Sequence, residues 1–293
     1  MRKKKKDIHK TLLIVPSNDA EAVLINLIAQ KIGLPTIVSR QSHGASLDKG
    51  RDYFSEIISG GYSRVITVEM PGPNTEARLR SSGIEMKIID HHNYTGLDRA
   101  HDSHGNVLLS SLEQFLKMFR ITDACLKKMG LDPLLVHGIG IQDRGFIWAL
   151  QKEGYSRSQI GRVMDYHDEL ISLVRDSKTE ANKKQSALRA WKRRKKWKEF
   201  IVIETRSKFQ LRPQLSRVVA QKIGKPTALI IVDETRALIY VQESALAPRL
   251  FDCFGGFTFG SDMGWGYRNS KFHKKVTLFK VKKEIDRLTS NKF

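Results

Sequence analysis

The sequence predicts an α/β fold, in which a mainly parallel sheet flanked by helices is followed by a second, smaller α+β domain joined through a helical linker. Two observations favour this fold class. Early in the 293-residue chain, short runs rich in Ile and Val alternate with helix-like segments, as they do in βαβ units. A basic, proline-free stretch then separates these runs from a second set of apolar runs.

The first set contains the candidate strands of the parallel sheet. These runs are "TLLIV" at 11–15, "PTIV" at 35–38, "RVITVE" at 64–69 and "EMKIID" at 85–90. A helical pattern follows at 110–130, where apolar residues such as Leu112, Phe115 and Phe119 recur at spacings of three and four. Gly130 gives this helix a stop signal.

Residues 155–199 contain no proline and predict a long helical connector. Its last part is strongly basic, with no acid before Glu199. The cations there are Lys183, Lys184, Arg189, Lys192, Arg193, Arg194, Lys195, Lys196 and Lys198. A solvated surface and a contact with an anion both fit this run; Trp191 and Trp197 favour a contact, since an aromatic ring among cations can stack on a base.

The second set of apolar runs predicts the smaller α+β domain. Strands are expected at "FIVIET" (200–205), "TALIIV" (227–232), "ALIYVQ" (237–242) and "VTLFKV" (276–281), around one helix near 213–223. The predicted boundaries are therefore 1–176 for the first domain, 177–199 for the basic helical linker and 200–293 for the second domain.

A glycine-rich segment in the second domain is a candidate for binding substrate. It reads "FDCFGGFTFGSDMGWGYRN". Gly255 and Gly256 would let the backbone approach a ligand closely, Tyr267 would stack on it, and Arg268 would pair with a phosphate. The alternative is a glycine-rich hairpin with an aromatic core.

The charge balance favours a polyanionic partner. The formal net charge is +20, from 51 Lys plus Arg against 31 Asp plus Glu, so nucleic acid or a nucleotide is the expected partner. Only Cys125 and Cys253 occur, which excludes a disulfide framework and favours the cytoplasm. The apolar run at 12–15 is too short for a membrane span, and no membrane association is expected.

Polar side chains follow several of the predicted strands. Because ligands bind at the carboxyl ends of parallel strands, these side chains are expected to converge. They are Asp19, Glu69, Asp90, His91, His92 and Asp143. Three carboxylates brought together repel one another unless a cation or a proton neutralises them. Taken one by one, Asp19 also fits a helix N-cap, Glu69 an exposed loop residue and Asp143 a turn former or a partner of Arg144.

Carboxylates combined with an imidazole suit Mn²⁺, whereas Mg²⁺ prefers shells made of oxygen alone. Manganese is therefore the expected metal, with Mg²⁺ as the alternative ion.

The segments "IIDHH" and "GIGIQDRGFI" resemble the motifs of the DHH phosphoesterase superfamily. This superfamily includes single-strand exonucleases, nano-RNA and cyclic-dinucleotide hydrolases and manganese pyrophosphatases. The resemblance covers roughly residues 11–150. The glycine-rich segment resembles, more distantly, the DHH-associated domain that binds substrate, although the usual Gly-Gly-Gly-His core is absent.

The resemblance implies a metal site. In the family's first motif a His precedes two Asp separated by one residue; here Asp19 matches the second Asp, Ser17 takes the place of the first, and an apolar residue near Leu13 or Val15 replaces the His. Relatives commonly hold two ions. The ligands implied for the first ion are Asp19, Glu69, His91 and Asp143, and most of the ligands for a second ion are missing.

The expected reaction is therefore metal-dependent phosphodiester hydrolysis around one ion. Asp90 would orient an imidazole, His92 would touch the substrate phosphate, and Arg144 would clamp it. Arg193 and Arg194 of the linker would hold the backbone of single-stranded nucleic acid, of a short oligonucleotide or of a related nucleotide. His101 or His104 could replace the missing histidine. The alternative is a protein of the same fold that binds RNA or DNA without turnover.

Overall fold

The computed structural model describes residues 8–42, 44–260, 262–270 and 275–290. The chain divides into two compact units, each assembled from separate stretches. Unit 1 consists of 1–91, 108–143 and 156–174, and unit 2 consists of 92–107, 144–155 and 175–293. The expected boundaries at 176 and 199 divide the chain into contiguous domains, whereas each unit combines separate stretches of chain. These boundaries stay a prediction.

Unit 1 is built on a parallel sheet with the strand order β2-β1-β3-β4. The strands are β1 (Thr11–Pro16), β2 (Thr36–Ser39), β3 (Arg64–Val68) and β4 (Glu85–Ile89). All six residues of β1 are buried, as expected for a central parallel strand covered on both faces. The four strands predicted from the apolar runs are confirmed.

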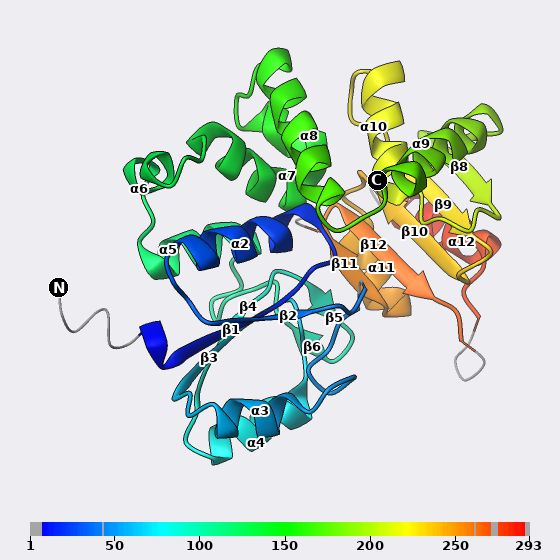
Figure 1. Ribbon diagram of the computed structural model, residues 1–293. Coiled ribbons are helices and arrows are strands. Elements are labelled where there is room, and N and C mark those ends of the chain that lie inside the picture. The colour runs from blue at the N-terminus through cyan, green and yellow to red at the C-terminus, as the bar shows by residue number, and fades with distance from the viewer. Residues whose placement is uncertain (1–7, 43, 261, 271–274, 291–293) are drawn as a thin grey trace. The chain divides into compact units, whose positions relative to one another are not determined.

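Helices cover both faces of this sheet (Figure 1). They are α2 (Ala20–Lys31) and α5 (Ser111–Phe119) on one face, and α3 (Tyr53–Ser59) and α4 (Pro73–Ser81) on the other. Alternate residues of β1 point to opposite faces, and Leu12 and Ile14 pack with Tyr53, Ile57 and Leu79 of α3 and α4. The expected α/β class with a flanked parallel sheet is confirmed.

Three further helices complete the middle of the chain. They are α6 (Asp123–Lys128), α7 (Pro133–Lys152) and α8 (Arg157–Ser172). The helix expected across 110–130 is two helices, because Arg120 ends α5 in the left-handed conformation and Thr122 caps α6. The stretch before Asp143 is helical and not a strand; α7 leaves helical geometry only at Gly145 and Phe146.

Unit 2 is built on a mixed sheet with the strand order β6-β5-β11-β12-β10-β9-β8-β7. The strands are β5 (Asn93–Tyr94), β6 (Leu97–Asp98), β7 (Lys195–Trp197), β8 (Phe200–Thr205), β9 (Leu229–Asp233), β10 (Leu238–Gln242), β11 (Phe257–Phe259) and β12 (Gly264–Arg268). Only β8 and β9 pair in parallel. The basic strand β7 therefore forms one edge of this sheet.

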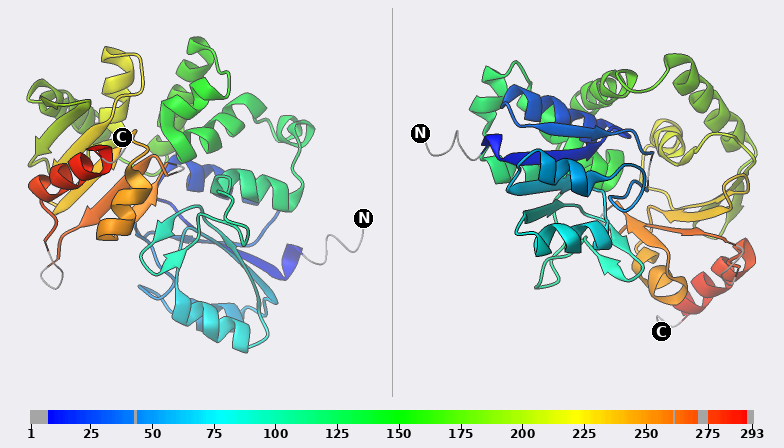
Figure 2. Two further views of the ribbon diagram at one scale, coloured as in Figure 1. Left: turned by 180° about the vertical axis from the view of Figure 1, so that it is seen from behind. Right: turned by 60° about the horizontal axis from the view of Figure 1, so that its bottom comes forward.

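Helices cover both faces of the second sheet, as Figure 2 shows, and each face has its own hydrophobic core. The helices are α9 (Ser177–Lys192) and α10 (Arg212–Lys222) on one face, and α11 (Ala247–Phe254) and α12 (Leu278–Ser290) on the other. Alternation along β9 places Ile231 in the core with α9 and α10, and Ile230 in the core with α11 and α12. The expectation of a second sheet with helices is confirmed.

Two local expectations for unit 2 are wrong. The connector is helical only up to α9, and its basic end turns into strand β7. The run "VTLFKV" begins helix α12, because Val281, Ile285 and Leu288 recur at helical spacing and are buried together. None of the helices in the described part of the chain is both long enough and apolar enough to cross a bilayer.

Replacing Ser110 by Ala should destabilise the protein by about 1 kcal/mol, because its hydroxyl and the side chain of Glu113 form a capping box at the start of α5. Urea unfolding measures this change. Ser158→Ala, at an exposed position of α8, is the control and should stay within about 0.5 kcal/mol of wild type. Equal effects of the two substitutions would contradict the capping role.

Candidate metal centre

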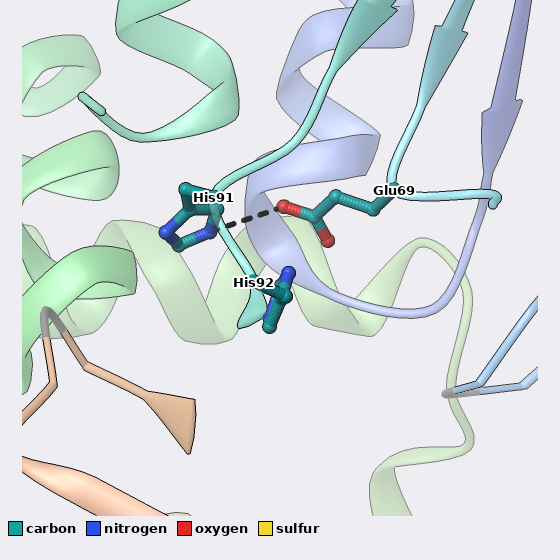
Figure 3. Close-up of side chains that lie close together, drawn as sticks. All are labelled: Glu69, His91 and His92. Carbon is teal, nitrogen blue, oxygen red and sulfur yellow. Dashed lines mark ion pairs between the residues drawn. The ribbon is translucent and has the colours of Figure 1, made fainter. Parts of the chain in front are cut away.

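One imidazole and three carboxylates meet within unit 1. Ligand atoms of Glu21, Glu69, His91 and Asp143 all lie within 4.8 Å of one another. Nε2 of His91 is 3.2 Å from Oε1 of Glu69 and 2.9 Å from Oδ2 of Asp143. Figure 3 shows the side chains of Glu69 and His91 pointing toward each other. The predicted convergence of Glu69, His91 and Asp143 is therefore found in the structure.

Glu69 directly follows strand β3, which fixes its position. Its backbone has a φ of 49°, in the left-handed region, while its N–H donates to the carbonyl of Ile89 at the end of the neighbouring strand β4. The hydroxyl of Ser111, in the first turn of α5, donates to Oε1 of Glu69 at 2.8 Å. This backbone conformation is costly for a non-glycine residue, so the contacts with Ile89 and Ser111 must hold Glu69 in it.

His91 lies two residues after the end of strand β4, and its position is fixed through its backbone. Oδ1 of the buried Asp90 accepts a hydrogen bond from the N–H of His91 at 2.8 Å, and Gln114 of α5 donates to the carbonyl of Asp90 at 2.9 Å. Asp90 was expected to orient an imidazole; the contact found here is with the backbone of His91. The direction of the His91 side chain thus depends on both β4 and α5.

Glu21 belongs to the cluster and was not expected from the sequence. It lies in the first turn of α2 with 2% of its surface exposed, and its Oε1 accepts from the N–H of Leu112 at 2.9 Å. Its other oxygen, Oε2, is buried and has no hydrogen-bond partner among the described residues. A buried carboxylate oxygen left in this state is costly unless a proton or a cation reaches it.

Asp19 is not a member of this group. Its Oδ1 accepts from the N–H of Ala22 at 2.8 Å, so Asp19 is the N-cap of α2, which is the alternative that its sequence position also fitted. The acid two residues further along, Glu21, has its ligand atoms in the cluster instead.

The charges in the cluster shift the acidity of its members. Burial raises the pKa of Glu21 well above its usual value, and the negative charges of Asp143 and Glu69 raise it further. Burial lowers the pKa of His91, but hydrogen bonds and charges from Asp143 and Glu69 outweigh this effect and bring it well above the usual value. Protons thus satisfy the excess negative charge when no metal is bound.

The donor set fits a divalent cation. Three carboxylates and one imidazole offer hard oxygen ligands and one nitrogen, which suit such an ion. The buried Oε2 of Glu21 is available as a ligand without breaking a hydrogen bond among the described residues. The residues present therefore fit one metal ion.

Two predicted catalytic residues belong to unit 2. His92 stacks on Tyr94 with ring centroids 5.8 Å apart, and Arg144 pairs with Glu153 at 3.1 Å. His101 is also in unit 2, where its ring nitrogens lie 2.8 Å from Asp98 and 3.2 Å from Asp262. The structure does not join His101 to the cluster.

The predicted substrate-binding residues also lie in unit 2. The glycine-rich segment forms the hairpin β11–β12, which matches the alternative left open for it. A Cβ on Gly256 would lie 2.2 Å from the carbonyl oxygen of Gly266, so close strand packing by itself requires glycine there. Tyr267 stacks on Trp265, and Arg268 is exposed at the end of β12. Their role in binding stays a prediction.

The two linker arginines lie at the end of helix α9. Arg193 is its exposed C-cap, and the guanidinium of Arg194 lies 4.5 Å from the ring centroid of Trp191.

Comparison of structures shows which fold this is. An exopolyphosphatase-related protein from Bacteroides fragilis aligns with a TM-score of 0.50 and 11% identity, over 96% of this chain and 91% of that chain. The DHH domain of a member of a ribosomal protein family aligns with a TM-score of 0.42 and 13% identity, over 79% of this chain and 73% of that chain. Exonuclease RecJ bound to manganese aligns with a TM-score of 0.40 and 14% identity, over 99% of this chain and 92% of that chain.

No family profile matches the chain, and no curated protein matches it by sequence. The likeness is one of fold, and it agrees with the resemblance of the motifs to the DHH superfamily.

Replacing Glu21 by Gln should weaken Mn²⁺ binding by at least about tenfold, because it removes a charged ligand and leaves the helix intact. Asp19→Asn is the matched control and should bind nearly as well as wild type, since Asn also caps helices. Calorimetric titration with MnCl₂ measures both. If only Asp19→Asn lost affinity for Mn²⁺, Asp19 and not Glu21 would be the metal ligand.

The metal-free protein should lose stability as the pH rises above 6.5. The folded-state pKa of His91 lies above its unfolded value, so its stabilising contribution is complete below 6.5 and disappears as the pH passes the raised value. The raised pKa of Glu21 acts in the same direction.

Urea midpoints recorded across this range test the expectation. His91→Gln should flatten the profile; an unchanged profile in that variant would exclude His91 as its source.

Proposed function

We propose that this protein is a metal-dependent phosphoesterase that hydrolyses a phosphodiester bond in single-stranded nucleic acid, a short oligonucleotide or a related nucleotide. The observation that carries the proposal is the meeting of Glu21, Glu69, His91 and Asp143, of which Glu21 and His91 are buried. A net charge of +20 supports a polyanionic substrate, and the DHH-type fold supports phosphoester chemistry.

The four clustered residues hold one divalent ion, with Mn²⁺ as the first choice and Mg²⁺ as the alternative. When bound, such an ion lowers the pKa of a water molecule and neutralises charge on a phosphoryl oxygen. The chain itself supplies the fixed geometry: Ser111 holds Glu69, and the N–H of Leu112 holds Glu21. Both donors belong to the start of α5, so one helix terminus orients two ligands.

The remaining roles follow from position along the chain. Asp90 holds the backbone that carries His91. We assign His92, the next residue, to contact with the substrate phosphate, and Arg144, next to Asp143, to clamping it. In this proposal the protein acts in the cytoplasm, which fits its two free cysteines.

Binding without turnover is the second candidate, and two departures from the family's motifs favour it. Ser17 takes the place of a motif Asp, and position 69 carries Glu where the matching motif carries Asp, so the extra methylene of Glu69 moves its carboxylate outward. A displacement of about 1 Å at a reacting centre is enough to cost two orders of magnitude in rate. Salt-sensitive binding of RNA or DNA with no cleavage under any divalent ion would select this candidate.

Purified protein with Mn²⁺ should hydrolyse at least one substrate among labelled oligonucleotides, dinucleotides and cyclic dinucleotides. Asp143→Asn should lower the rate at least about 100-fold, because it removes a charged ligand from the centre. Asp165→Asn, an exposed position on α8 with the same change of charge, is the control and should leave the rate unchanged. Equal rates for the two variants would refute the proposed centre.

A further inference from the structure

The end of α9, strand β7 and the loop after β8 form a basic surface of unit 2, here called the α9–β7 surface. Its cations line two cavities. The first, of about 670 Å³, is lined by Arg189, Arg193, Arg206 and Lys208 together with Glu204 and Glu234. The second, of about 850 Å³, is lined by Arg194, Lys195, Lys196, Lys198, Lys222 and Lys225 together with Glu199.

Two consecutive residues at the end of α9 line different cavities. Arg193 lines the first cavity and Arg194, the next residue, lines the second. The chain then runs directly into the edge strand β7, whose Lys195 and Lys196 continue the second cavity. Cations therefore run without interruption from one cavity to the other.

Most of these cations are not neutralised by the protein. Arg206 pairs with Glu234 at 2.6 Å, Lys195 pairs with Glu204 at 3.3 Å, and Lys198 pairs with Asp286. Within the described residues, no acid pairs with the following: Arg189, Lys192, Arg193, Arg194, Lys196, Lys222 and Lys225. Exposed like charges held at this density repel one another, and an anion relieves that repulsion.

Protection of a sheet edge accounts for only part of the pattern. Lysines on an edge strand prevent pairing with other chains, and β7 contributes two of them, Lys195 and Lys196. Arg189 and Arg193 lie on α9, Lys208 lies after β8, and Lys222 ends α10, so none of these four lies on the edge strand. Their presence in the same cavities requires another explanation.

We propose that the α9–β7 surface binds the phosphate backbone of a single-stranded nucleic acid. This deepens the proposed function and rests on it, because it selects single strands among the polyanionic substrates. A flexible strand can place successive phosphates in two separate cavities, which the convex surface of a duplex cannot enter. A flat anionic membrane fits less well, since Glu204 and Glu234 line the first cavity and Trp191 is buried.

The surface contacts the backbone and not the bases. Arg194 lies over the ring of Trp191, and Lys198 and Lys282 lie 5.6 Å and 5.0 Å from the ring centroid of Trp197. Both aromatic residues thus already have cationic partners within the chain. Binding is therefore expected to depend on phosphates and salt, with little preference for base sequence.

The test replaces Arg189, Arg193 and Lys196 together by Gln. Binding of a fluorescent oligothymidylate is measured by anisotropy over a range of salt concentrations, in EDTA so that no cleavage occurs. The affinity should fall at least about tenfold, and the slope of log K against log salt should become shallower by about 2, because three phosphate contacts are lost.

A matched triple variant controls for bulk charge. Lys31→Gln, Lys117→Gln and Lys128→Gln remove the same charge from exposed positions of unit 1 and should leave both affinity and slope close to wild type. Equal losses in the two triple variants, or tighter binding to phosphatidylserine vesicles than to the oligonucleotide, would overturn the proposal.

Hydrolysis of bis(p-nitrophenyl) phosphate with Mn²⁺ separates this proposal from the proposed function. If wild type itself shows no hydrolysis while oligonucleotide binding still depends on Arg189, Arg193 and Lys196, the enzymatic proposal fails and the binding surface stands.

Discussion

The mutual repulsion of Glu21, Glu69 and Asp143 is the constraint on which the candidate site depends. Three carboxylates share a small volume with the imidazole of His91, and one carboxylate oxygen has no hydrogen-bond partner among the described residues. Such an arrangement is stable only if positive charge neutralises it. The raised pKa values of His91 and Glu21 favour protonation of both groups in the metal-free protein, and one divalent ion would neutralise the cluster better.

The fold of unit 1 holds these groups together against their repulsion. Glu69 and His91 follow two neighbouring parallel strands, so their positions are fixed by the pairing of β3 with β4. Glu21 and Asp143 come from helices, and the first turn of α5 reaches both glutamates through Ser111 and Leu112. A substitution that loosens α5 would therefore change the site without touching a ligand.

Much of the fold and part of the site could be predicted from the sequence. The four parallel strands could be predicted because strands buried on both faces are short, continuous apolar runs. Glu69 and His91 could then be predicted as site residues because they lie just after the ends of two of these strands. Helix α12 was mistaken for a strand because "VTLFKV" is rich in β-branched residues, whereas its period becomes visible only further along, at Ile285 and Leu288.

Glu21 was missed for a related reason: a search confined to strand ends passes over the first turn of a helix. The acid-x-acid spacing of Asp19 and Glu21 was the available signal.

Crystals grown with MnCl₂ test the central claim most directly, through an anomalous difference map at the manganese edge. The account predicts one strong peak coordinated by Glu21, Glu69, His91 and Asp143; a map with no peak there, or with its strongest peak among other residues, would contradict it.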